Sequence, residues 1–67
     1  MRLETYVGRI VSLRQESFRP VVSRARRQGM DLENRFIVAS VNADMRKLIC
    51  YGADFRVAVN AADVALL

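Results

Sequence analysis

Arginine is the side chain with which this sequence could do most of its chemistry, and it is concentrated in the first half of the chain. Residues 2–27 contain seven arginines against two glutamates, whereas residues 28–67 contain four cations against five acids. A guanidinium group binds phosphate through paired hydrogen bonds, and binding of this kind weakens as salt is added. The candidate phosphate-binding residues are Arg19, Arg24, Arg26, Arg27, Arg2 and Arg9.

The same charges fit a second interpretation, in which they solvate one face of a helix and contact no ligand. Ten arginines accompany a single lysine, a bias that can arise from a GC-rich coding sequence. No nucleic-acid-binding motif accompanies the cluster, and exposed aromatic residues are not interleaved with it. Most aromatic residues lie inside apolar patterns typical of a core, but Tyr51, beside Gly52 at a strand end, is a candidate to bind a base or a cation.

The residues that usually carry catalysis or bind metals are scarce. The sequence has no histidine and a single cysteine, Cys50, so the common general base and the spacing of a zinc site are both missing. Cys50 lies in an apolar run, where cysteine behaves as a small buried hydrophobe. The acids after residue 30 fall in predicted loops and turns, where aspartate is common for backbone reasons. We therefore expect no enzymatic activity, no cofactor and no metal, and a reducing, cytoplasmic location.

The arginines fall in a segment, residues 3–28, whose apolar side chains recur with a helical period. This pattern predicts an amphipathic helix, kinked or split near 15–19, because Pro20 disfavours a continuous helix and Ser17 can cap a new one. The alternative is a strand over residues 5–13, which are rich in β-branched side chains and include Gly8. Gly29 follows three polar residues and predicts the end of the helix.

From residue 35 onward the sequence changes to the period of β-strands. Residues 36–41 are apolar on both faces, residues 46–51 return as a second strand, and residues 55–59 alternate cleanly. Turn residues at 42–44 and 52–54 separate them. The spacing predicts an antiparallel β-meander over 35–60, followed by a short helical turn or closing strand over 61–67.

These elements predict one small α+β domain spanning residues 1–67, in which the N-terminal helix packs on a three-stranded antiparallel meander. The second half, with Tyr51-Gly52 before a strand and a small turn before Val64 to Leu67, resembles the tail of an SH3-like or Tudor-like barrel. That resemblance covers about half the chain and implies, as the alternative fold, a small SH3-like barrel.

The apolar content points to a partner. Hydrophobic residues make up 52% of the chain, more than the thin core of a 67-residue domain needs. We expect a homo-oligomer or an acidic protein partner, with an interface of Phe36, Ile37, Val38 and Val41. No apolar run is long enough to predict a membrane span.

Two functions are compatible with these patterns. The first is a small non-enzymatic binding protein whose arginine-rich helix contacts the phosphates of DNA or RNA. The alternative is a protein-interaction or homo-oligomeric assembly module that buries the helix and the strand 36–41.

Overall fold

A computed structural model of the chain describes residues 2–67, which form one α-helix and one five-stranded antiparallel sheet. The elements follow in the order η1 (Leu3–Tyr6), β1 (Ile10–Leu13), α1 (Gln15–Arg27), β2 (Phe36–Asn42), β3 (Lys47–Gly52), β4 (Phe55–Asn60), η2 (Ala61–Asp63) and β5 (Val64–Leu66), where η denotes a 3-10 helix. The α+β class predicted from the sequence is confirmed. The helices described are too short or too polar to cross a lipid bilayer.

The predicted helix over 3–28 is wrong in its first half. The 3-10 helix η1 ends at Tyr6, Gly8 then adopts a left-handed φ of +83°, and Ile10 and Val11 enter a strand. Their β-branched side chains favour extended backbone, and the strand finds hydrogen-bonding partners on both of its sides, β2 and β5. The strand alternative for this segment therefore holds for Ile10–Leu13.

The second half of the segment is one helix. It begins at Gln15, with Arg14 rather than Ser17 in the N-cap position, and Pro20 lies inside it. Its end matches the prediction: Gly29 is left-handed at +76°, and the N–H groups of Gly29 and Met30 donate to the carbonyls of Arg26 and Ala25. These two hydrogen bonds form the Schellman motif, which satisfies carbonyl groups that the helix leaves unpaired.

The predicted meander is present as β2, β3 and β4, but it is part of a larger sheet. The strand order is β4-β3-β2-β1-β5, so β1 and β5 extend the meander past β2. Both expectations for the C-terminal residues hold in part, because a 3-10 turn precedes a short strand. The SH3-like alternative is not met as a closed barrel, since β4 and β5 lie at opposite edges of the sheet and do not pair with each other.

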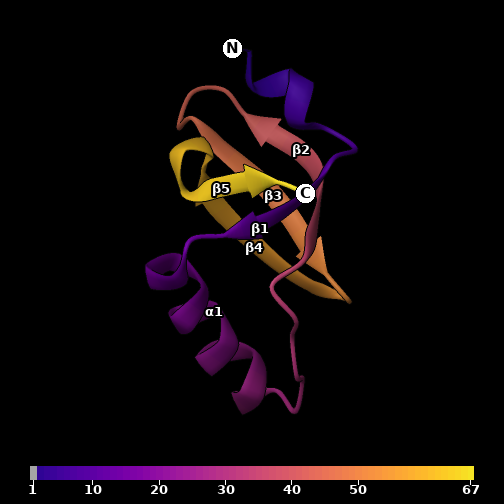
Figure 1. Cartoon of the computed structure of the whole chain (residues 1–67), viewed down its shortest axis with the longest axis vertical. Coiled ribbons are helices and arrows are strands. Elements are labelled where there is room, and N and C mark those ends of the chain that lie inside the picture. The colour runs from indigo at the N-terminus through magenta and orange to yellow at the C-terminus, as the bar shows by residue number, and fades with distance from the viewer. Residues whose placement is uncertain (1) are drawn as a thin grey trace.

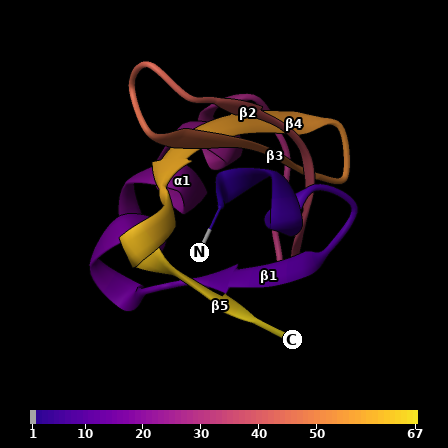
Figure 2. The same cartoon turned by 90° about the horizontal axis from the view of Figure 1, so that it is seen from above.

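The core lies on the concave face of this curled sheet. Alternate residues of β1 to β4 point inward and are buried, and Val21 and Ala25 of α1 join them. Leu3 and Tyr6 of η1 also pack against this core. Figure 2 shows η1 inside the curve of the sheet, with β2, β3 and β4 on one side and β1 and β5 on the other. No element within residues 2–67 covers the outer face of the strands.

Candidate functional site

Helix α1 projects from one end of the molecule, and one of its sides holds it to the sheet (Figure 1). Val21 and Ala25 are buried, and the ring of Phe18 meets that of Phe36 edge-on, with centroids 6.1 Å apart and planes at 75°. An edge-to-face pair of this kind is favourable beyond the area it buries. The other sides of α1 face solvent and carry its arginines.

Arg19 and Arg26 lie on the same side of α1. Seven residues are close to two full turns, so these side chains emerge one above the other. They line a shallow hollow of about 390 Å³ together with Phe18 and Val22, which are half-buried, and two uncharged polar residues. The hollow thus combines two guanidinium groups with an apolar floor, a composition suited to an anion attached to an apolar body.

Arg24 and Arg27 do not share this side. The guanidinium carbon of Arg24 lies 5.5 Å from the centroid of the Phe55 ring, a cation–π contact with the first residue of β4. Arg27 is exposed in the last position of the helix. The helix therefore carries cations on several sides rather than in one stripe.

Arg2 and Arg9 are not on this helix at all. Arg2 precedes η1, and Arg9 precedes β1, where its carbonyl accepts a hydrogen bond from the N–H of Val38. This segment lies at the end of the molecule away from α1 (Figure 1). The six candidate phosphate-binding arginines are accordingly divided between two separate basic regions.

The cations of α1 have no carboxylate partners in the structure. Within residues 2–67 the one ion pair is Arg14 with Asp63, at 4.0 Å and largely exposed. Exposed pairs of this kind contribute little to stability. Glu16 is the single acid of α1 against Arg19, Arg24, Arg26 and Arg27, so the helix carries uncompensated positive charge.

The four residues predicted to form an interface are divided between the two faces of β2. Phe36 and Val38 are buried in the protein's own core, each 1% exposed, and cannot form an external surface in this fold. Val41 is half-buried and packs against the core. Ile37 points to the outer face and is 45% exposed.

Tyr51 lies beside Ile37 on the outer face of the sheet. The register pairs Tyr51 with Ile37 on β2 and with Arg56 on β4. The exposure expected for Tyr51 is present, at 36%. The clean alternation of residues 55–59 predicts the outward position of Arg56, and the structure confirms it, but Arg56 was not among the candidate site residues named from the sequence.

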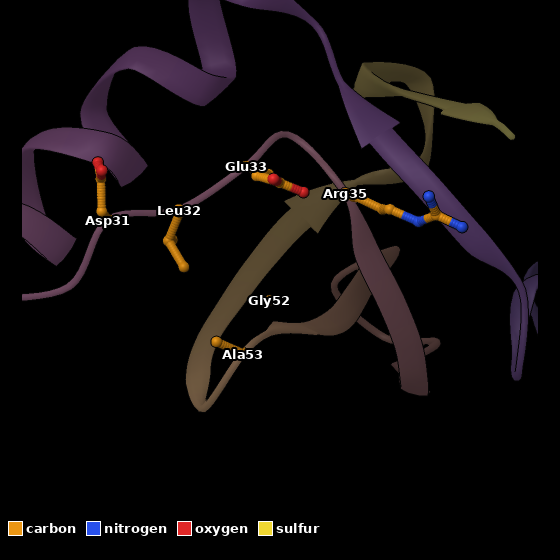
Figure 3. A pocket seen from close by; sticks show the side chains of 6 residues that line it. All are labelled: Asp31, Leu32, Glu33, Arg35, Gly52 and Ala53. Atoms are coloured by element: carbon orange, nitrogen blue, oxygen red, sulfur yellow. The ribbon is translucent and has the colours of Figure 1, made fainter.

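A second hollow, a groove of about 290 Å³, lies between the loop before β2 and the β3–β4 turn. Figure 3 shows the side chains of its lining residues: Asp31 and Arg35 extend away from each other, and the two carboxylates do not converge. No group of acids, cysteines or histidines in residues 2–67 is arranged to hold a metal ion. This groove therefore offers no evident chemistry.

Comparisons of the chain with protein-family models, with curated proteins and with solved structures found no significant match. The function must therefore be argued from the residues themselves.

Proposed function

We propose that this protein is a small, non-enzymatic, cytoplasmic nucleic-acid-binding protein, and that α1 is its phosphate-binding element. Arg19 and Arg26 contact phosphates as a pair, and Arg27 adds charge at the end of the helix. The observation that carries the proposal is the uncompensated charge of α1. The helix has four arginines and one glutamate, and within residues 2–67 none of these five side chains forms an ion pair. Such a surface binds a polyanion, and the favourable free energy of binding comes mainly from the release of the counterions that surround the polyanion.

Arg24 has a lesser place in this proposal, because its guanidinium is already stacked on Phe55. Stacking leaves the edges of a guanidinium free to donate hydrogen bonds, so Arg24 can still reach a phosphate. Arg2 and Arg9 belong to the segment before β1, which lies at the other end of the molecule (Figure 1), and they form a separate basic region.

The test is the binding of fluorescently labelled DNA and RNA strands across a salt series, followed by anisotropy. The variant R19Q/R26Q should bind at least about tenfold more weakly at low salt. Its log–log salt dependence should be shallower by about 1.4 to 1.8, because two phosphate contacts are lost. The matched control is R2Q/R9Q, which removes the same charge from the opposite end and should change affinity much less.

Equal losses in the two variants would mean that only net charge matters and would contradict a site on α1. Absence of binding at low salt would reject the function itself. The thermal unfolding midpoint of each variant, measured by circular dichroism, should match that of the wild type, because the exchanged side chains are exposed.

The alternative, an assembly module, retains one observation in its favour. Ile37, Leu66 and Leu67 are large apolar side chains that are 42–65% exposed. Sedimentation velocity over a range of concentrations tests this alternative, since a self-assembling protein should show a mass that rises with concentration.

A further inference from the structure

The outer face of the sheet carries a row of side chains that no element of the structure covers. The row crosses three strands, from Ile37 through Tyr51 to Arg56. Directly paired residues on antiparallel strands place their Cβ atoms about 5 Å apart, so these side chains lie side by side. Ile10, paired with Ile37, continues the row onto β1.

The charged side chains on the outer face of the sheet are all cations. The five strands contain two cations, Lys47 and Arg56, and no acid. Both cations alternate with buried residues of β3 and β4 and so belong to the outer face. Neither forms an ion pair within residues 2–67. An exposed tyrosine is thus set between an aliphatic side chain and an unpaired guanidinium.

We propose that Tyr51 and Arg56 form a stacking site for one unpaired nucleotide, and that the ligand of this protein is therefore a single strand. This inference rests on the proposed function and specifies its ligand. The base would stack on the Tyr51 ring against Ile37, and its phosphate would meet Arg56. Bases in a duplex already stack on each other and present only their edges, whereas a single strand offers the flat faces that an aromatic side chain binds.

A second copy of this chain fits the same face less well. Two such faces brought together would bury Lys47 and Arg56 opposite like charges, with no acid on either strand surface to compensate them. A polyanion with apolar faces complements both the charge and the apolar area.

The site also connects to α1 around one edge of the sheet. β4 is an edge strand, and its first two residues point to opposite faces: Phe55 inward, beneath Arg24, and Arg56 outward, beside Tyr51. A flexible single strand that passes around this edge can meet the cations of α1 and the outer face in turn. A stiff duplex cannot follow so short a path, because its persistence length is about 50 nm.

The test uses a labelled oligothymidine strand and a duplex of the same length. Y51A should weaken single-strand binding about tenfold or more while leaving the salt slope unchanged, and Y51F should bind like the wild type, because stacking needs only the ring. R56Q should instead make the slope shallower by about 0.7. M45A, which truncates an exposed apolar side chain in the β2–β3 turn, is the matched control and should change nothing.

A second measurement does not depend on affinity. The chain has no tryptophan, so Y51W places the single tryptophan of the variant at the site, and its indole emission can be followed by itself. Its emission should be quenched when oligothymidine is added and should not change with duplex.

Three results would overturn the inference. If Y51A binds the single strand normally while R19Q/R26Q does not, the proposed function stands and the stacking site is rejected. Tighter binding of duplex than of single strand would reject it as well. If the wild type is a dimer that the Y51A substitution dissociates, and if oligothymidine does not quench the emission of Y51W, the outer face would be assigned to a second copy of the chain.

Discussion

Cys50 shows how position in the sheet sets the reactivity of a residue. It lies on the inner face of β3 and is fully buried. Burial raises the pKa of the Cys50 thiol to about 11, because the apolar surroundings disfavour the thiolate. The thiol is therefore uncharged at neutral pH, in agreement with its interpretation as a small core side chain.

The raised pKa predicts a loss of stability in alkaline solution. The unfolded thiol ionises first, at its ordinary pKa of about 9, so the contribution of Cys50 to stability is complete below that pH and is lost as pH rises toward 11. Urea unfolding should show a loss on the order of 1–2 kcal/mol by pH 10 in the wild type. C50V, which cannot ionise, is the reference, and an equal loss in both proteins would contradict the assignment to Cys50.

Gly52 is a second residue whose identity the packing requires. A Cβ atom at this position would lie 2.6 Å from Cε2 of Phe36, whose ring is buried and cannot turn away. We expect G52A to lose about 1–3 kcal/mol of unfolding free energy in urea, the usual cost of overpacking.

The neighbouring residue, Ala53, provides a control in which the expected change in stability has the opposite sign. Ala53 has a left-handed φ of 51°, a conformation that costs a residue with a Cβ about 1 kcal/mol and suits glycine. A53G should therefore stabilise the protein slightly. A loss in A53G as large as that in G52A would mean that the hairpin tolerates no change, rather than that Phe36 excludes the added methyl group.

At the scale of elements, the end of β1 is held by a side chain that makes the hydrogen bonds a neighbouring strand would otherwise make. On one side β1 pairs with β2 through Ile10 and Val11, and on that same side the partner of Leu13 is the side-chain amide of Asn34. Its Oδ1 accepts from the Leu13 N–H at 2.7 Å, and its Nδ2 donates to the Leu13 carbonyl at 2.8 Å. This pair reproduces the hydrogen bonds of a strand neighbour at the point where the chain turns into α1.

Removal of the Asn34 amide should therefore loosen β1. N34A leaves two polar groups of the nearly buried Leu13 without their partner, so we expect a loss of about 2 kcal/mol or more in urea unfolding. N60A is the matched control, because Asn60 is exposed and its side chain makes no capping hydrogen bond, and it should change stability by less than about 0.5 kcal/mol. Equal effects of the two substitutions would show that the amide of Asn34 has no special role.

The success of sequence interpretation also varied by element. The meander and the helix end at Gly29 were predictable because alternation, turn residues and a C-terminal glycine are local signals. The error over residues 3–13 has a physical cause: the apolar residues of this segment fit a helical period, but the pairing of β1 with β2 and β5 is decided by distant residues. The side-chain role of Asn34 had no sequence signal.

For the whole molecule, the distribution of charge was easier to predict than its placement. The basic first half of the sequence is real, yet the fold puts the segment before β1, which contains Arg2 and Arg9, at one end of the molecule and α1 at the other (Figure 1). The outer sheet face could have been anticipated in part, since Arg56 and Tyr51 occupy alternating positions of their strands. Their direct pairing depended on the hairpin register, which the turn residues alone did not specify.

The place of β1 between β2 and β5 in the sheet has a consequence for how the protein folds. The hairpins β2–β3 and β3–β4 join neighbouring segments, whereas β1 pairs residues 11–13 with residues 64–66, almost the whole length of the chain away. Closing so long a loop costs chain entropy before any contact repays it, which slows folding. The meander can therefore form early from local contacts, and the rate at which the complete sheet appears is set by the meeting of the two distant ends on β1.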